Sequence, residues 1–190
     1  MLDLETEERV LLRASIRRFL DRELPRSLAR ELDRKADYSR EAFHRLCKDL
    51  GVTALMAPEQ YGGTGVDIVS AIIVVEELAR RGTSLAGPFI HCAFYGAMNI
   101  LENGSQRQKD LFLPLLARGE LLFAYGLSEP DVGGDLASAA VTATLSADGQ
   151  RVTINGVKRW CTGARIADYI YTLVRSGPAE ARYKNLSLIL

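Results

Sequence analysis

The hydrophobic pattern of this 190-residue chain changes its period near residue 120. Before that point apolar residues recur at spacings of three, four and seven, which is typical of amphipathic helices. After it, short alternating segments are separated by Gly and Asn turns, which is typical of strands. Helices followed by strands favour an α+β protein over a doubly wound sheet. We therefore expect an all-α helical domain over residues 1–121 and a β domain over residues 122–190.

Capping signals divide the helical part into five expected helices. The first carries an apolar stripe from Leu4 to Leu20, and Pro25 after it marks a break or a fresh start. The later helices are expected from Ser39 to Gly51, from Asp67 to Gly82, from Pro88 to Asn103-Gly104 and, after a capping box at Ser105–Gln108, to near Gly119.

The β part contains two dipeptides that favour hairpins. Asp148-Gly149 separates two alternating segments, and Asn155-Gly156 predicts a second, tighter hairpin before Val157–Trp160. The expected strands cover residues 121–125, 141–145, 151–154, 157–160, 169–174 and 186–190. The last ends at Leu190 with no partner strand after it, and natural proteins usually cover such an edge. We therefore expect the chain to be part of a longer protein.

Composition argues against several classes of protein. Equal numbers of basic and acidic residues, 24 of each, lack the surplus typical of nucleic-acid binding. Cys47, Cys92 and Cys161 form an odd set without Cys-x-x-Cys spacing, so no disulfide framework or metal site is expected. The two histidines, His44 and His91, lie in helical patterns and are interpreted as packing residues. No apolar run has the length of a membrane span, and the acidic N-terminus lacks signal-peptide features, which predicts a cytoplasmic protein.

Three local features have structural interpretations. The Arg-rich face between Arg9 and Arg22 is accompanied by acids and is expected to be a solvated helix surface. Glu76-Glu77 is expected to be solvated or to pair with another helix. The segment Gly62–Gly65 follows no central strand and lacks the last glycine of a dinucleotide motif, so we interpret it as the entry to a helix.

The stretch Tyr125–Asp135, YGLSEPDVGGD, combines turn residues with three acids and no cation. It presents backbone N–H groups and the Ser128 hydroxyl. Neutral donors of this kind suit a polar heteroaromatic ring better than a bare phosphate. The alternative is an ordinary turn whose acids cap the next segment.

The second candidate is Trp160-Cys161-Thr162, which we expect on a strand. Alternation would put Trp160 and Thr162 on one face and Cys161 on the other. Trp160 could stack on a planar ligand, and Thr162 could donate to it. The alternatives are a core tryptophan at a strand end and a small buried cysteine. Spacing alone identifies no enzyme.

Taken together, these stretches resemble the acyl-CoA dehydrogenase family over nearly the whole chain. Tyr125–Asp135 is similar to the flavin loop of that family, and Asn155-Gly-Val-Lys-Arg-Trp-Cys-Thr162 to its Asn-Gly-x-Lys-x-Trp-Ile-Thr strand pair. The helical part carries three further segments that resemble the family, which are Ala57–Gly65, Val75–Ala79 and Gly104–Glu120.

The resemblance implies an N-terminal helical domain, a truncated middle β-barrel domain and a C-terminal helical bundle absent from this chain, with FAD as cofactor. The implied cofactor-binding residues are Tyr125, Leu127, Ser128, Trp160, Cys161 and Thr162, and the implied acyl-CoA-binding residues are Gly133 and Gly134. By this resemblance Trp160 packs against the isoalloxazine, Thr162 donates toward its N5 and Ser128 contacts its pyrimidine side.

Two departures from the family stand out. Gly134 occupies a position where the family usually has a serine that helps to hold CoA. The family's chain is also roughly twice as long, and the missing half carries the catalytic carboxylate, so no residue here is assigned a catalytic role.

The implied activity is α,β-dehydrogenation of an acyl-CoA thioester with hydride transfer to flavin N5. An electron-transfer flavoprotein is the expected acceptor, and a homo-oligomer (dimer or tetramer) or a heteromer the expected assembly. The alternatives are a related flavin monooxygenase or nitroalkane oxidase, and a non-catalytic half-subunit that needs a second chain.

Overall fold

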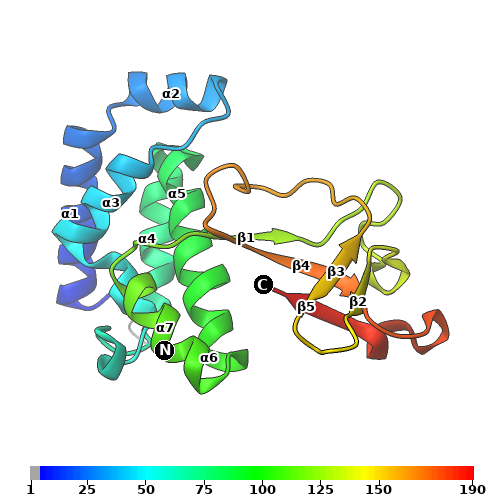
Figure 1. Cartoon of the computed structure of the whole chain (residues 1–190). Helices are drawn as coiled ribbons and strands as arrows, with labels where there is room; N and C mark the ends of the chain where they lie inside the picture. The colour runs from blue at the N-terminus through cyan, green and yellow to red at the C-terminus, as the bar shows by residue number, and fades with distance from the viewer. Residues whose placement is uncertain (1–4) are drawn as a thin grey trace. The chain divides into compact units, whose positions relative to one another are not determined.

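The computed structural model describes residues 5–190, except for the side chain of Ala179. The chain divides into two compact units, Met1–Leu122 and Phe123–Leu190. The first is helical and the second contains the sheet, which confirms the predicted order of helices and strands (Figure 1).

The first unit is built from helices joined by short turns. They are α1 Glu7–Glu23, α2 Arg26–Arg34, α3 Arg40–Leu50, η1 Val52–Met56, η2 Glu59–Tyr61, α4 Ile68–Arg81, α5 Thr83–Ile90, the π-helix η3 His91–Met98, α6 Asn99–Asn103 and α7 Gln106–Ala117. Their shared core contains large side chains that are fully buried, among them Phe19, Phe43, Phe89, Leu46 and Leu78.

Local capping explains where three of these helices begin. The Ser39 hydroxyl accepts from the Ala42 N–H at the start of α3, and Asp67 accepts from the Ser70 N–H at the start of α4. At α7 a complete capping box forms around Ser105. Because these bonds satisfy N–H groups that no helical carbonyl can reach, the predicted starts of these helices are confirmed.

The structure moves the start of one expected helix and adds one further helix. The expected helix from Pro88 begins earlier, at Thr83, and continues through α5, η3 and α6 to Asn103. Pro88 is tolerated inside it because Phe89 and its neighbours are buried, which offsets one missing hydrogen bond. Pro25 marks a fresh start, one of its two expected roles, because it is the N-cap of α2, a helix that was not among the five expected.

The sequence predicted that the Arg-rich face of α1 is a solvated helix surface. In the structure, part of this face is paired with another helix. Helix α1 packs beside α4 (Figure 1). Glu77 of α4 is only 2% exposed and accepts from Arg13 Nη1 at 2.9 Å and from Arg17 Nη2 at 2.6 Å. Arg9 likewise reaches Asp67 at 3.3 Å. Glu76 accepts from Arg13 Nη1 at 2.7 Å as well, so the expectation that Glu76-Glu77 pairs helices is confirmed.

The second unit is a five-stranded mixed sheet. Its strands are β1 Phe123–Gly126, β2 Thr142–Leu145, β3 Val152–Asn155, β4 Tyr169–Arg175 and β5 Leu186–Ile189. They are ordered β1-β4-β2-β3, and β5 pairs antiparallel with β4. The β2–β3 hairpin at Asp148-Gly149 is confirmed, with Gly149 at φ 69°.

The expected strand over Val157–Trp160, and with it the Asn155-Gly156 hairpin, is absent. Gly156 adopts φ 135° and lies so close to Val141 that a Cβ would be 2.6 Å from that side chain. Trp160 adopts φ 61°, which no pleated strand allows. The segment leaves the sheet because its polar groups bind the Tyr125–Asp135 loop instead.

Candidate functional site

The two candidate motifs lie thirty residues apart in the sequence and meet in the sheet unit. The Arg159 N–H donates to the Ser128 carbonyl oxygen at 2.8 Å. Lys158 Nζ donates to the Leu127 carbonyl oxygen at 2.9 Å and to Glu129 Oε1 at 2.8 Å. The loop and the segment that carries Trp160 therefore form one site.

Glu129 is buried beneath this site and fixes the position of the loop. Its carboxylate accepts from the backbone N–H groups of Ala140 at 2.7 Å and Val141 at 3.0 Å, in addition to Lys158. Burial by itself raises the pKa of the Glu129 carboxyl, but the hydrogen bonds from Lys158 and the two N–H groups outweigh it and lower the pKa below its usual value. Glu129 is thus a fixed, ionised anchor for the loop.

The acids of the loop were predicted to be either caps or part of a ligand site, and two of them cap. Glu129 ties the loop to Ala140 and Val141. Asp135 accepts from the Ser138 hydroxyl at 2.6 Å at the start of the short helix η4, Leu136–Ser138. These contacts leave the outer surface of the loop available to a ligand.

That surface forms an open cavity of about 280 Å³. Its lining contains Ser128, Glu129, Pro130, Asp131, Val132, Gly133 and Trp160. Trp160 is 75% exposed, and the Arg159 guanidinium lies 4.5 Å from its ring centre. Among the described residues no side chain or backbone group bonds the Ser128 hydroxyl. The cavity therefore offers one exposed aromatic face and one spare hydroxyl.

Of the predicted site residues, Ser128, Gly133 and Trp160 line this cavity. Gly134 is exposed beside it but does not line it, and a Cβ at Gly134 would meet no atom within 4 Å. The Tyr125 ring stacks on Tyr171 of β4 at 5.3 Å instead.

The other three predicted residues, Leu127, Cys161 and Thr162, do not line the cavity. Leu127 is half-buried and offers its carbonyl to Lys158. Cys161 is also half-buried and is a free thiol. Thr162 is exposed, and its N–H donates to the Trp160 carbonyl at 2.8 Å. The predicted strand alternation of Trp160, Cys161 and Thr162 was wrong, because this tight turn replaces the strand.

Sequence reasoning missed the role of Lys158. Its side chain is 10% exposed and supplies the positive charge that the loop itself lacks. The available signal was the pair of basic residues Lys158-Arg159 shortly after the Asn155-Gly156 turn, in a chain whose Tyr125–Asp135 loop has three acids and no cation.

Among residues 5–190, no group of His, Cys, Asp and Glu side chains is placed to hold a metal ion. Within the same residues no helix is both long and apolar enough to cross a bilayer. His91 is 2% exposed and stacks on Tyr95 at 5.2 Å, as expected of a packing residue.

Comparison with known proteins identifies the family. Residues 6–120 match the family model described as acyl-CoA dehydrogenase, N-terminal domain, and residues 124–190 match the middle domain of the same family. The chain belongs to the acyl-CoA dehydrogenase family.

Curated and solved acyl-CoA dehydrogenases resemble the chain along most of its length. An acyl-CoA dehydrogenase of Bacillus subtilis is 33% identical over 94% of the chain and 46% of its own length. The crystal structure of the acyl-CoA dehydrogenase from Geobacillus kaustophilus superposes with a TM-score of 0.89 at 28% identity, over 100% of this chain and 49% of that one. The chain spans less than half the length of these two relatives.

A third relative carries a cofactor. The acyl-CoA dehydrogenase from Bacillus anthracis was solved in complex with FAD and matches 90% of this chain and 29% of its own, with a TM-score of 0.78 and 31% identity. The cavity beside Trp160 is chemically suited to such a ring system, because its one buried carboxylate is already neutralised by Lys158. An uncharged heteroaromatic surface can thus approach without leaving a buried charge unpaired.

Proposed function

We propose that this chain is the helical and β part of an FAD-dependent acyl-CoA dehydrogenase. The observation that carries the proposal is the joining of the Tyr125–Asp135 loop to the Trp160 segment around an open cavity whose buried carboxylate, Glu129, is neutralised by Lys158. Family membership supports an oxidoreductase acting on acyl-CoA thioesters. Bound FAD supplies the two-electron acceptor for dehydrogenation.

In this proposal the chain's own residues bind and orient the flavin. The exposed Trp160 ring covers one side of the isoalloxazine and keeps water from it. Ser128 donates its spare hydroxyl to a ring heteroatom, assisted by backbone N–H groups of Tyr125 and Leu127. Thr162, whose side chain is exposed next to the tight turn, would donate a further hydrogen bond to the bound flavin.

The Lys158–Glu129 ion pair has a positioning role. It keeps the loop and the Trp160 segment in register, so that the hydroxyl and the indole face the same ligand. Glu129 is not the base that removes the substrate α-proton, because its lone pairs are already occupied by Lys158 and two backbone N–H groups.

Gly133 and Gly134 are proposed to border the acyl-CoA. Both are exposed, and a Cβ at either position would have open space around it, so a thioester chain can pass close to the backbone. An electron-transfer flavoprotein as acceptor, a homo-oligomeric assembly and a cytoplasmic location complete the proposal.

The test is flavin retention in the whole protein purified from its own cells. Trp160→Ala should weaken FAD binding by about 2 kcal/mol, roughly 30-fold, and Ser128→Ala by about 1 kcal/mol, roughly fivefold. Tyr183→Ala serves as the control, because Tyr183 is another exposed aromatic of the sheet unit (63%) that does not line the cavity. Equal flavin content in all three variants and the wild type would refute the site.

A native mass spectrum of the same preparation then identifies the assembly. Flavin bound to a longer chain, or to this chain together with a second subunit, supports the proposal. A flavin-free protein contradicts it.

A further inference from the structure

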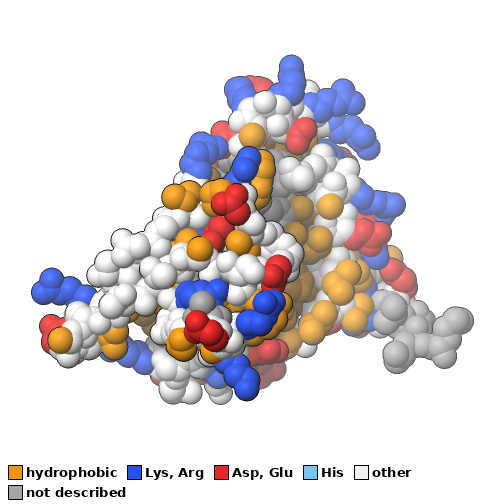
Figure 2. All heavy atoms as spheres, turned by 90° about the vertical axis from the view of Figure 1, so that its right-hand side faces the viewer, with side chains coloured by type: hydrophobic (Ala, Val, Ile, Leu, Met, Phe, Trp, Pro, Cys, Tyr) orange, Lys and Arg blue, Asp and Glu red, His pale blue; other side chains and the backbone are white. Residues whose placement is uncertain are grey.

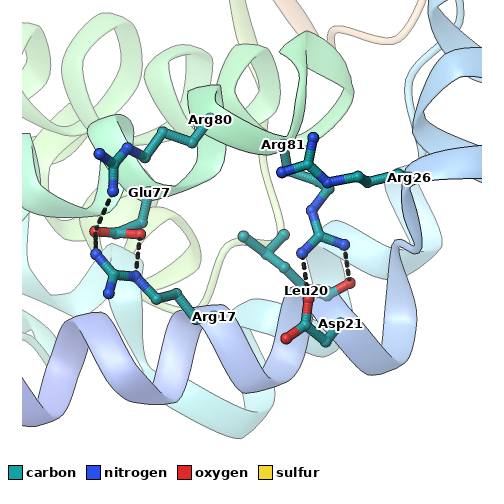
Figure 3. Close-up of a pocket in the computed structure, with 7 residues that line it drawn as sticks. All are labelled: Arg17, Leu20, Asp21, Arg26, Glu77, Arg80 and Arg81. Atoms are coloured by element: carbon teal, nitrogen blue, oxygen red, sulfur yellow. Dashed lines mark hydrogen bonds and ion pairs between the residues drawn. The ribbon is translucent and has the colours of Figure 1, made fainter.

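The helical unit contains an arginine-lined cavity of about 490 Å³ between α1, α2 and α4 (Figure 3). Its lining includes Arg17, Arg26, Arg80, Arg81, Asp21 and Glu77. Four guanidinium groups against two carboxylates leave an excess of two positive charges. Like charges that share one cavity repel each other unless an anion lies between them.

Both carboxylates are already occupied. Glu77 is 2% exposed and binds Arg17 at 2.6 Å, with Arg80 at 3.8 Å. Asp21 binds Arg81, whose guanidinium also donates to the Leu20 carbonyl at 3.1 Å. Figure 3 shows these two groups at opposite ends of the cavity, so each end presents an arginine pair.

Arg26 is the least satisfied of these cations. Within the described part of the chain its side chain makes no hydrogen bond or ion pair. It is also the first residue of α2, a helix with Pro25 as N-cap, no capping side chain and no acid in its first turn. The positive end of a helix dipole and an adjacent cation are mutually unfavourable, and an anion at that point relieves both.

Helix α2 carries further charged side chains next to the cavity. Figure 2 shows Lys and Arg side chains gathered at the top of the molecule, where Figure 1 places α2. Beyond Arg26, the sequence of α2, RSLARELDR, contributes Arg30 and Arg34, which Glu31 and Asp33 of the same helix offset. The excess positive charge therefore comes from the arginines that line the cavity, and its field raises the local concentration of small anions.

We propose that this cavity binds a diphosphate group, either as pyrophosphate or as part of a nucleoside diphosphate. Guanidinium groups bind phosphate oxygens in a bidentate manner, which makes arginine the preferred residue for such a site. Arginine pairs at two ends of one cavity match two linked phosphoryl groups better than a single one. Arg26 and Arg80 are assigned the main contacts, since Arg26 has no ion pair among the described residues and Arg80 has only a long one to Glu77, at 3.8 Å. Arg17 and Arg81 are instead hydrogen-bonded to carboxylates.

The test is calorimetric titration of the whole flavin-loaded protein with pyrophosphate, ADP and orthophosphate at low ionic strength. We expect a pyrophosphate Kd of roughly 10–100 µM and orthophosphate binding at least about tenfold weaker. ADP binding as tightly as pyrophosphate would assign a nucleotide, and pyrophosphate binding alone would assign the free diphosphate. The bound anion should also raise the thermal midpoint, because it binds only the folded state.

The variant Arg26→Ala/Arg80→Ala should weaken pyrophosphate binding at least about tenfold with unchanged flavin content. The matched control Arg30→Ala/Arg34→Ala removes the same charge from α2 outside the cavity and should change affinity less than about threefold. Equal weakening by both variants, equal affinity for orthophosphate, or no binding at millimolar pyrophosphate would overturn the proposal. Since the Arg26 side chain makes no hydrogen bond or ion pair within the described residues, Arg26→Ala alone should keep its thermal midpoint in anion-free buffer. A lower midpoint would also count against the site.

Discussion

Replacing Lys158 by methionine tests the anchor that joins the two site segments. The Glu129 side chain is 6% exposed, so Lys158→Met leaves a buried carboxylate with only two backbone N–H donors. Removing one partner of a buried ion pair costs about 3–5 kcal/mol, and the remaining donors favour the lower end of that range. A loss of about 3 kcal/mol corresponds to a fall in Tm of roughly 6–12 °C for a chain of this size.

The loss of stability in Lys158→Met should depend on pH. In the wild type the folded-state pKa of Glu129 is lowered, so the ion pair stabilises the fold above the unfolded pKa, and this stability is lost as pH falls through the folded pKa. Without Lys158, burial dominates and raises the pKa of Glu129. The deficit of the variant should therefore be largest near pH 7 and shrink toward pH 4.

The assay is urea unfolding followed by far-ultraviolet circular dichroism at several pH values. Lys184→Met is the control, because Lys184 is an exposed lysine of the same unit, and it should change the free energy of unfolding by less than about 0.5 kcal/mol. A loss below about 1 kcal/mol for Lys158→Met, or a deficit independent of pH, would refute the anchoring role of the pair.

Three further predictions concern a buried carboxylate, an exposed glycine and a buried thiol. The Glu77 carboxylate is 2% exposed and joins α1 to α4. Glu77→Gln removes its charge and should lower the free energy of unfolding in urea by about 3 kcal/mol. The control Glu76→Gln changes an exposed neighbouring residue and should lower it by less than about 0.5 kcal/mol. Gly134→Ser has open space for its Cβ, so it should keep or raise stability by up to about 1 kcal/mol and tighten acyl-CoA binding in a spectral titration; a lower Tm would contradict this. Burial raises the pKa of the Cys47 thiol to about 12, so iodoacetamide at pH 8 should label the half-buried Cys161 first, as peptide mass mapping would report; faster labelling of Cys47 would show that its burial is incomplete.

Most of the helical architecture could be predicted from the sequence, because its determinants are local. The caps at Ser39, Asp67 and Ser105 each bond an N–H group only three residues away. The Asp148-Gly149 hairpin is equally local. The family could also be inferred from the amino-acid sequence, because the segments that carry the resemblance are short and continuous.

Tertiary structure decided the features that depend on distant partners. Val157–Trp160 has a strand-like sequence, but Lys158 reaches Glu129 and Leu127, and this pairing draws the segment out of the sheet. Pro88 remains inside a helix because the burial around it outweighs its local preference.

The pairing of buried charged side chains also depends on residues far away in the sequence. The sequence determined that α1 carries arginines at helical spacing and that the Tyr125–Asp135 loop lacks a cation. Only the folded chain decided which of those charges are neutralised, because Glu77 and Glu129 find their partners about sixty and thirty residues away. Local bonds depend on neighbouring residues alone, whereas the compensation of a buried charge depends on which distant segments the core brings together.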